Sequence, residues 1–144
     1  MKDFPRTPVR LAIASEPAHL PIVRAAAERI SDLMGFDQVT SGTIMLAVDE
    51  ALTNVIRHAY AGANDKPIEI TLTCLSSSND EEALCIEIRD WGERVDPSRI
   101  KARDLDDVRP GGLGVHIMNT VMDEVSYAPA EGGGTCLKMT KKVS

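Results

Sequence analysis

The 144-residue sequence has few aromatic residues and an acidic charge balance. Aromatic residues make up 3% of the chain, which leaves little surface for stacking against single-stranded nucleic acid. With 22 acidic against 16 basic residues, the chain lacks the positive field on which nonspecific binding to nucleic acid or to anionic membranes depends. We therefore expect no direct binding to nucleic acid.

Cysteine and long hydrophobic runs are also scarce. Cys74, Cys85 and Cys136 lie far apart, without Cys-x-x-Cys spacing, and each belongs to an apolar, strand-like run. This pattern favours buried, reduced thiols and a reducing cytoplasm. The N-terminus has no signal-peptide pattern, and no later stretch approaches membrane-spanning length. We therefore expect a single domain over residues 1–144, located in the cytoplasm and not attached to a membrane.

Hydrophobic periodicity and turn residues predict the order strand, helix, helix, strand, strand, loop, helix, strand, strand. Strands are predicted at 9–14, 68–75, 84–89, 125–128 and 135–141, and helices at about 17–34, 37–61 and 112–123. Residues 92–110 contain few apolar side chains and are predicted to form a loop. This order fits an α+β fold, a two-layer sandwich with a mostly antiparallel sheet covered on one face by three helices.

The second predicted helix carries a polar stripe on a largely apolar surface. Glu50, Asn54 and His58 are spaced i, i+4, i+8, so a regular α-helix places them on one face. Burying a carboxylate and an amide there is unfavourable unless they are paired or bind a ligand. A carboxylate can act as a general base, and an amide oxygen can ligate Mg²⁺. From this pair alone, an exposed acidic residue and an asparagine without a function are as expected as a catalytic or metal-binding pair.

Two further patterns suggest ligand contacts. Asp90 follows an alternating strand pattern, and Gly92 allows close backbone approach, so the carboxylate could accept a hydrogen bond from an amine such as that of adenine. An ordinary Asp-x-Gly turn is at least as common. Gly111, Gly112 and Gly114 open an apolar helix whose free amides could bind phosphate. No Lys-Ser or Lys-Thr follows, as a P-loop requires, and no histidine has a ligand-spaced partner for zinc.

Taken in order, Glu-x-x-x-Asn at 50–54, Asp-x-Gly at 90–92, Gly-Gly-Leu-Gly at 111–114 and a glycine turn before the last strand resemble the GHKL, or Bergerat, ATP-binding fold. More narrowly, residues 49–60, 112–118 and 122–125 are similar to the bacterial anti-sigma-factor serine/threonine kinases. The similarity spans nearly the whole chain. Three motifs in register are far more specific than any one of them.

The resemblance implies ATP and Mg²⁺ as cofactors. It implies that Glu50 is the catalytic base and Asn54 the Mg²⁺ ligand, that Asp90 and Gly92 contact adenine, and that Thr135 lies nearby. It also implies an ATP lid at about residues 93–111, hinged at Gly112 and Gly114. The other nucleotide-binding residues that it implies are Arg57, His58, Val95, Gly111, Leu113 and Val115. In one departure, residues 90–94 read Asp-Trp-Gly-Glu-Arg where the superfamily often has Asp-x-Gly-x-Gly, a difference that bears on the geometry of the lid.

The resembled family consists of ATP-dependent protein kinases that act as anti-sigma factors. They phosphorylate an anti-anti-sigma protein of the STAS type and sequester a sigma factor, and we expect this chain to form a homodimer. The alternative is a nucleotide-gated binding module of the same fold without kinase activity. Glu50 favours the enzyme, because nucleotide affinity alone needs no base. On the first helix, Arg24 and Glu28 are expected to face outward, where they form an intrahelical ion pair or where Arg24 belongs to a partner surface.

Overall fold

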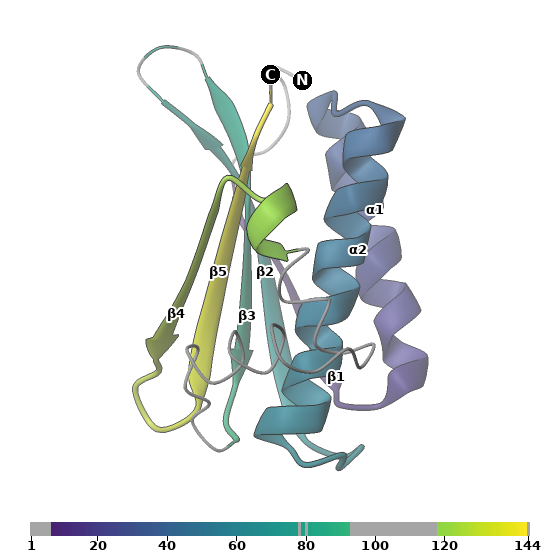
Figure 1. The fold of residues 1–144 in the computed structure, drawn as a ribbon, viewed down its shortest axis with the longest axis vertical. Helices are drawn as coiled ribbons and strands as arrows, with labels where there is room; N and C mark the ends of the chain where they lie inside the picture. Colours follow the sequence, from purple (N-terminus) through teal and green to yellow (C-terminus); the bar gives the residue numbers. More distant parts are fainter. Residues whose placement is uncertain (1–6, 78, 80, 93–117, 144) are drawn as a thin grey trace.

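A single antiparallel sheet forms one layer of the protein (Figure 1). The computed structural model describes residues 7–77, 79, 81–92 and 118–143. Five strands pair in the order β1-β2-β3-β5-β4. Their bounds are Val9–Ala14 for β1, Pro67–Ser76 for β2, Glu82–Asp90 for β3, Glu124–Pro129 for β4 and Thr135–Lys142 for β5. Every pairing between these strands is antiparallel, and the predicted α+β class is confirmed.

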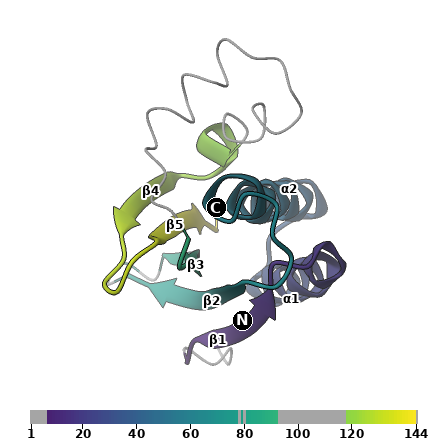
Figure 2. The same cartoon turned by 90° about the horizontal axis from the view of Figure 1, so that it is seen from below.

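Two long helices form the second layer and lie side by side over one face of the sheet (Figures 1 and 2). A short 3₁₀ turn at Pro17–His19 leads into α1, Leu20–Met34, which ends at Gly35 in a left-handed conformation with φ of 89°. The second helix, α2, covers Gln38–Asn54 and is capped by Asp37, whose Oδ1 accepts the Thr40 N–H at 2.7 Å. Glycine and aspartate at these two positions are the expected stop and start signals.

The third predicted helix is described only at its C-terminal end. Residues 118–121 are helical, and Met118 and Met122 pack into the same core as α1 and α2. Residues 112–117 of this predicted helix and residues 93–110 of the predicted loop lie outside the described residues.

The core lies between the sheet and the helices, as the alternation of the strands predicts. Alternate residues of β2 and β3, such as Ile70 and Ile86, are fully buried under Ile44 and Leu52 of α2. The opposite face of the sheet is polar, as expected for an antiparallel sheet with one face covered. Two of the cysteines, Cys74 and Cys85, are buried as predicted, whereas Cys136 is only half-buried, and none of the three forms a disulfide.

The predicted continuous α-helix at 37–61 is wrong at its C-terminal end. The α-helix stops at Asn54, and Val55–Ala59 form a π-helical turn in which the Tyr60 N–H donates to the Val55 carbonyl at 3.0 Å. A π turn contains one more residue than an α turn. The spacing of Glu50, Asn54 and His58 is therefore that of a regular α-helix only between Glu50 and Asn54.

The ion pair predicted for Arg24 also needs correction. Arg24 pairs with Asp49 of α2, with 3.4 Å between Nε and Oδ1, rather than with Glu28 of its own helix. Ser15 lies directly after β1. Its hydroxyl donates to the Ala63 carbonyl and accepts the Lys66 N–H, so it connects the end of β1 to the loop before β2. Within the part of the chain that the structure describes, no helix is long and apolar enough to cross a membrane.

Candidate functional site

A cavity of about 30 Å³ lies where the C-terminal end of α2 meets the sheet. It is lined by residues of α2, of the π turn and of β3, β4 and β5, namely Ala51, Asn54, Val55, His58, Ala59, Asp90, Tyr127, Thr135 and Leu137. Four of these residues, Asn54, His58, Asp90 and Thr135, are among those that the sequence predicts for a nucleotide site. The fold therefore brings together residues that are up to 81 positions apart in the sequence.

Asp90 contributes a carboxylate at the end of β3. It is 4% exposed, and its Oδ1 accepts the N–H of Gly92 at 3.0 Å and the N–H of Thr135 at 3.3 Å. Burial raises the pKa of the Asp90 carboxyl, and these two hydrogen bonds partly oppose that shift. Because both bonds fall on Oδ1, the described residues leave Oδ2 available to accept a hydrogen bond from a ligand.

Asn54 contributes a buried amide at the last position of α2. The residue is 7% exposed, and neither its Oδ1 nor its Nδ2 has a hydrogen-bond partner among the described residues. A buried amide without partners is costly, on the order of 1–3 kcal/mol for each unsatisfied group. Such a group in a cavity wall is what a ligand-binding role predicts.

Two glycines allow the backbone to close tightly around Asp90. A Cβ at Gly92 would lie 2.2 Å from the Ala59 carbonyl oxygen, and a Cβ at Gly134 would lie 2.0 Å from the Asp90 carbonyl oxygen. Gly134 also has φ of 79°, which side-chain-bearing residues rarely adopt. The turn at Asp90 is thus held between the end of α2 on one side and the β4–β5 turn on the other.

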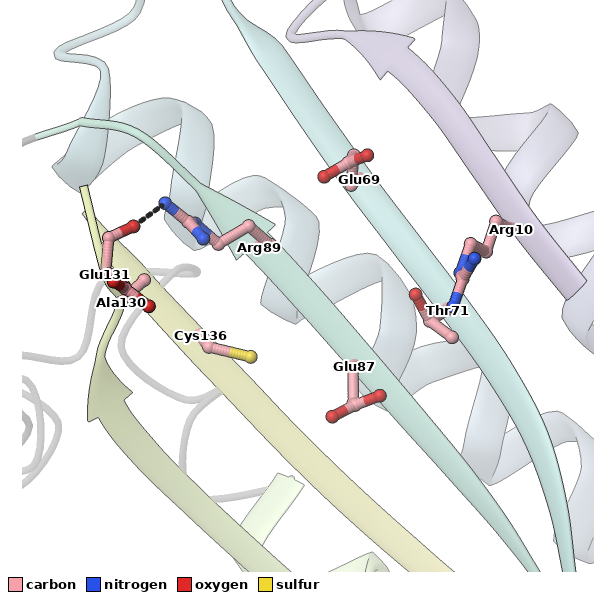
Figure 3. Close-up of a pocket in the computed structure, with 8 residues that line it drawn as sticks. All are labelled: Arg10, Glu69, Thr71, Glu87, Arg89, Ala130, Glu131 and Cys136. Carbon is pink, nitrogen blue, oxygen red and sulfur yellow. Dashed lines mark hydrogen bonds between the residues drawn. The ribbon is translucent and has the colours of Figure 1, made fainter. Parts of the chain in front are cut away.

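The β4–β5 turn is fastened from the open face of the sheet by Arg89. Its Nη2 donates to the Glu131 carbonyl at 2.8 Å (Figure 3). The same Nη2 also donates to the Gly133 carbonyl at 3.0 Å. Its guanidinium also lies 4.4 Å from the centre of the Trp91 ring. Arg89 belongs to a second, open hollow of about 300 Å³ on that face, lined by Arg10, Glu69, Thr71, Glu87, Arg89, Ala130, Glu131 and Cys136.

The other predicted site residues are either described by the structure but do not line the cavity, or lie outside the described residues. Glu50 lies one turn before Asn54 on α2 and is half-buried, while Arg57 is exposed on the π turn; among the described residues, neither lines the cavity. Gly92 packs against the π turn rather than lining the cavity. The remaining predicted contacts lie outside the described residues: Val95, Gly111, Gly112, Leu113, Gly114 and Val115.

Sequence reasoning missed the apolar wall of the cavity. Tyr127 and Leu137 face it from paired positions on β4 and β5, and Val55 faces it from the π turn. The alternation of the last two strands could have placed Tyr127 and Leu137 on the helix-covered face. It could not have shown which part of that face is left open. The lining, apolar with a few directed polar groups, is typical of a small-molecule site, whereas the volume of about 30 Å³ is well below the roughly 300–1,000 Å³ usual for such sites.

Solved structures with a similar fold come from Mycobacterium tuberculosis and Pseudomonas aeruginosa. The RsbU and RsbW domains of Rv1364c from Mycobacterium tuberculosis match 97% of this chain with a TM-score of 0.63 and 15% identity, and this chain spans 34% of that longer chain. The SiaB–SiaC complex from Pseudomonas aeruginosa matches 94% of this chain and 88% of that chain, with a TM-score of 0.58 and 11% identity. At such low identity these matches concern the fold alone.

Sequence relatives align over most of the chain. The serine-protein kinase RsbW of Bacillus velezensis is 29% identical over 142 aligned residues, which cover 92% of this chain and 84% of the relative. The serine/threonine-protein kinase BtrW of Bordetella bronchiseptica is 33% identical over 94 residues, which cover 62% and 63% of the two chains. The family model for the histidine kinase-like ATPase domain matches residues 13–141. The chain therefore belongs to the histidine kinase-like ATPase domain family.

Proposed function

We propose that this protein is an ATP-dependent protein serine/threonine kinase that acts as an anti-sigma factor. In this proposal it phosphorylates an anti-anti-sigma protein of the STAS type and sequesters a sigma factor. Membership of an ATPase family supports the use of ATP. Alignment over 92% of the chain with a relative named serine-protein kinase supports phosphoryl transfer to a protein hydroxyl.

One observation carries the nucleotide part of the proposal: a buried acceptor carboxylate and a buried amide without partners line the same cavity. The Asp90 carboxylate is held by two N–H groups on Oδ1, so its second oxygen can accept a hydrogen bond from the exocyclic amine of adenine. Thr135 lies beside it and lines the same wall. The apolar side chains of Val55 and Leu137 suit the faces of a base.

The Asn54 amide fits a role as Mg²⁺ ligand. Its buried oxygen has no hydrogen-bond partner among the described residues, and amide oxygens are suitable ligands for this hard cation. Mg²⁺ in nucleotide sites usually takes one or two protein ligands and completes its shell with water and phosphate oxygens. When bound, Mg²⁺ would neutralise charge on the phosphates during transfer. In this proposal Asn54 is the protein ligand, and water and phosphate oxygens complete the shell.

Glu50 is the proposed general base. It lies one helical turn before Asn54, and α2 fixes the spacing between the two side chains. In the transfer step the Glu50 carboxylate takes the proton of the serine or threonine hydroxyl. The hydroxyl oxygen forms a bond to the γ-phosphorus, and the bond from that phosphorus to the bridging oxygen breaks, so that ADP leaves with the electron pair.

The partner assignments belong to the same proposal. Capture of a sigma factor and homodimer formation rest on the resemblance of residues 49–60, 112–118 and 122–125 to the anti-sigma kinases. A cytoplasmic location rests on the pattern of the cysteines, which favours reduced thiols. Light scattering on the purified protein, alone and with the sigma factor, would measure the masses of the dimer and of the complex. A monomeric mass at all concentrations would contradict the dimer.

The kinase assignment is tested by incubating the purified protein with γ-labelled ATP, Mg²⁺ and the STAS-type protein encoded beside it. We expect label to move to a serine or threonine of that protein. Glu50→Gln should abolish transfer while ADP affinity stays within a few fold, because the substitution removes a base and keeps the size of the side chain. Glu28→Gln, which removes an exposed carboxylate of α1, is the matched control and should transfer label normally.

The outcomes separate the two candidate functions. Transfer by Glu50→Gln at the wild-type rate would mean that Glu50 is not the base. ADP binding by the wild type without transfer to any protein would favour the nucleotide-gated binding module. No affinity for ADP would contradict the nucleotide site itself.

A further inference from the structure

The hydroxyl of Tyr60 joins three elements at the edge of the cavity. Tyr60 follows the π turn at the end of α2 and is 8% exposed. Its hydroxyl donates to the carbonyl of Pro67, the first residue of β2, and accepts the N–H of Trp91 at 2.8 Å, directly after β3. One side chain thus connects the end of α2, the start of β2 and the end of β3.

The bond to Trp91 acts on the turn that carries Asp90. The Trp91 N–H belongs to the peptide group immediately after Asp90, and the next N–H, that of Gly92, donates to the Asp90 carboxylate at 3.0 Å. The two consecutive N–H groups therefore have fixed partners, one in Tyr60 and one in Asp90 itself. Fixing the first restricts the backbone from which the Asp90 carboxylate projects.

The π turn is what brings Tyr60 to this position. The Tyr60 N–H donates to the carbonyl of Val55, five residues earlier, where a continued α-helix would have used Ile56. The same turn places Ala59 against Gly92 so closely that a Cβ on the glycine would lie 2.2 Å from the Ala59 carbonyl oxygen. Single π turns inside α-helices are frequently found at functional sites.

We propose that Tyr60 is a positioning residue for base recognition: its hydroxyl fixes the turn at Trp91, so that the Asp90 carboxylate presents its second oxygen in one orientation. This inference rests on the proposed function, in which Asp90 accepts a hydrogen bond from adenine. Adenine carries an amine donor where guanine carries a carbonyl acceptor. A well-oriented carboxylate attracts the first and repels the second, so the Tyr60 hydroxyl contributes to the preference for adenine.

The Tyr60 hydroxyl also stays protonated under ordinary conditions. Burial raises the pKa of this phenol above its usual value. It can therefore keep donating to the Pro67 carbonyl while it accepts from Trp91.

The test compares the affinities of Tyr60→Phe and wild type for ADP and GDP by calorimetry. We expect ADP affinity to fall by about five- to tenfold, because the hydrogen bond that orients the turn is lost. GDP affinity should change less than about twofold, because guanine gains nothing from the orientation of Asp90. The preference for ADP over GDP should therefore fall severalfold. Ser31→Ala is the matched control: it deletes another buried hydroxyl, which bonds to the Ala27 carbonyl within α1, and should leave the preference unchanged.

A purely structural role for Tyr60 predicts a different result. Loss of stability alone would leave both affinities of the folded protein unchanged or lower them equally, and either outcome with an unchanged ratio would overturn the inference. Hydrogen exchange on the wild type gives a test without a variant: the Trp91 amide should exchange slowly even though the residue is 40% exposed. Exchange at the rate of an unprotected amide would also overturn it. A wild type without affinity for ADP would instead contradict the proposed function on which the inference rests.

Discussion

Midway along the sheet, the side chains that face the helices are apolar and fully buried, whereas at the end of α2 the same layer contains polar groups. Ile86 of β3 lies between Leu72 of β2 and Met139 of β5, and all three are at most 2% exposed. At the other place the Asn54 amide is buried without partners, and the Asp90 carboxylate is buried with a raised pKa. The first region lowers the free energy of the folded state, and the second raises it.

This difference indicates that stability and ligand binding depend on different residues. Apolar side chains in a packed core gain free energy on folding. Buried polar groups without partners cost free energy until a ligand satisfies them. Substitutions in the core should therefore reduce stability and leave nucleotide affinity unchanged. Substitutions at the cavity should reduce nucleotide affinity and leave stability nearly unchanged.

The largest effect on stability is expected from Ile86→Ala. Removing a fully buried isoleucine should lower the free energy of unfolding by about 2–5 kcal/mol, because the neighbouring strands cannot close the space left behind. Urea denaturation measures the loss, and ADP affinity of the folded protein should stay within a few fold. Leu75→Ala, on the same hairpin but 41% exposed, is the control and should change stability by only about 0.5 kcal/mol. Equal losses in the two variants would contradict the assignment of the core.

An intermediate effect, on binding rather than stability, is expected from Asp90→Asn. An asparagine can keep Oδ1 as acceptor for Gly92 and Thr135, but it replaces the second oxygen by an NH₂ donor. ADP affinity should fall by roughly tenfold to a hundredfold, the equivalent of about 1.5–3 kcal/mol for a charged hydrogen bond. If calorimetry gave equal ADP affinities for this variant and the wild type, Asp90 would not contribute to nucleotide binding.

The same carboxylate should make stability and binding respond to pH in opposite directions. Because burial raises the pKa of Asp90 in the folded protein, its contribution to stability is fully present below its ordinary value of 3.8 and is lost as pH rises through the folded value. Relative to Asp90→Asn, the wild type should therefore lose stability as pH rises. Its ADP affinity should instead rise over that interval, because the ionised carboxylate is the better acceptor. Parallel pH profiles of stability for the two proteins would contradict this.

The sequence predicted much of the fold because the relevant signals are local. The alternation of apolar residues around Ile70 and Ile86 predicted the central hairpin, and Gly35 and Asp37 predicted the boundary between the two helices. The π turn after Asn54 was not predictable in this way, because hydrophobic periodicity reports which face is buried and not which carbonyl each N–H bonds.

The candidate site was predictable only in part, for a similar reason. Asn54, Asp90 and Thr135 were found through motifs whose order in the chain resembles a known family. Tyr60 was missed, because its hydroxyl acts through contacts with Pro67 and Trp91 that depend on the tertiary fold. The pairing of Arg24 with Asp49 was missed because it joins two helices, whereas sequence spacing reveals only pairs within one helix.

The smallest effect on stability, and the clearest separation of the two regions, is expected from Asn54→Ala. The unfolding free energy should stay the same or rise by up to about 1 kcal/mol, because the substitution removes a buried amide without partners and favours the helix. Binding should change instead: added Mg²⁺ should raise the ADP affinity of the wild type but not that of the variant.

Ser41→Ala provides a matched control on the same helix. The Ser41 hydroxyl is also buried without a hydrogen-bond partner among the described residues, but Ser41 lies 13 positions before Asn54, or about 20 Å along the helix, and does not line the cavity. It should show the same small change in stability and keep the wild-type response to Mg²⁺. If Asn54→Ala instead lost several kcal/mol, as a core truncation does, the amide would have protein partners in solution. The proposed difference between the packed apolar core and the polar cavity would then not hold at Asn54.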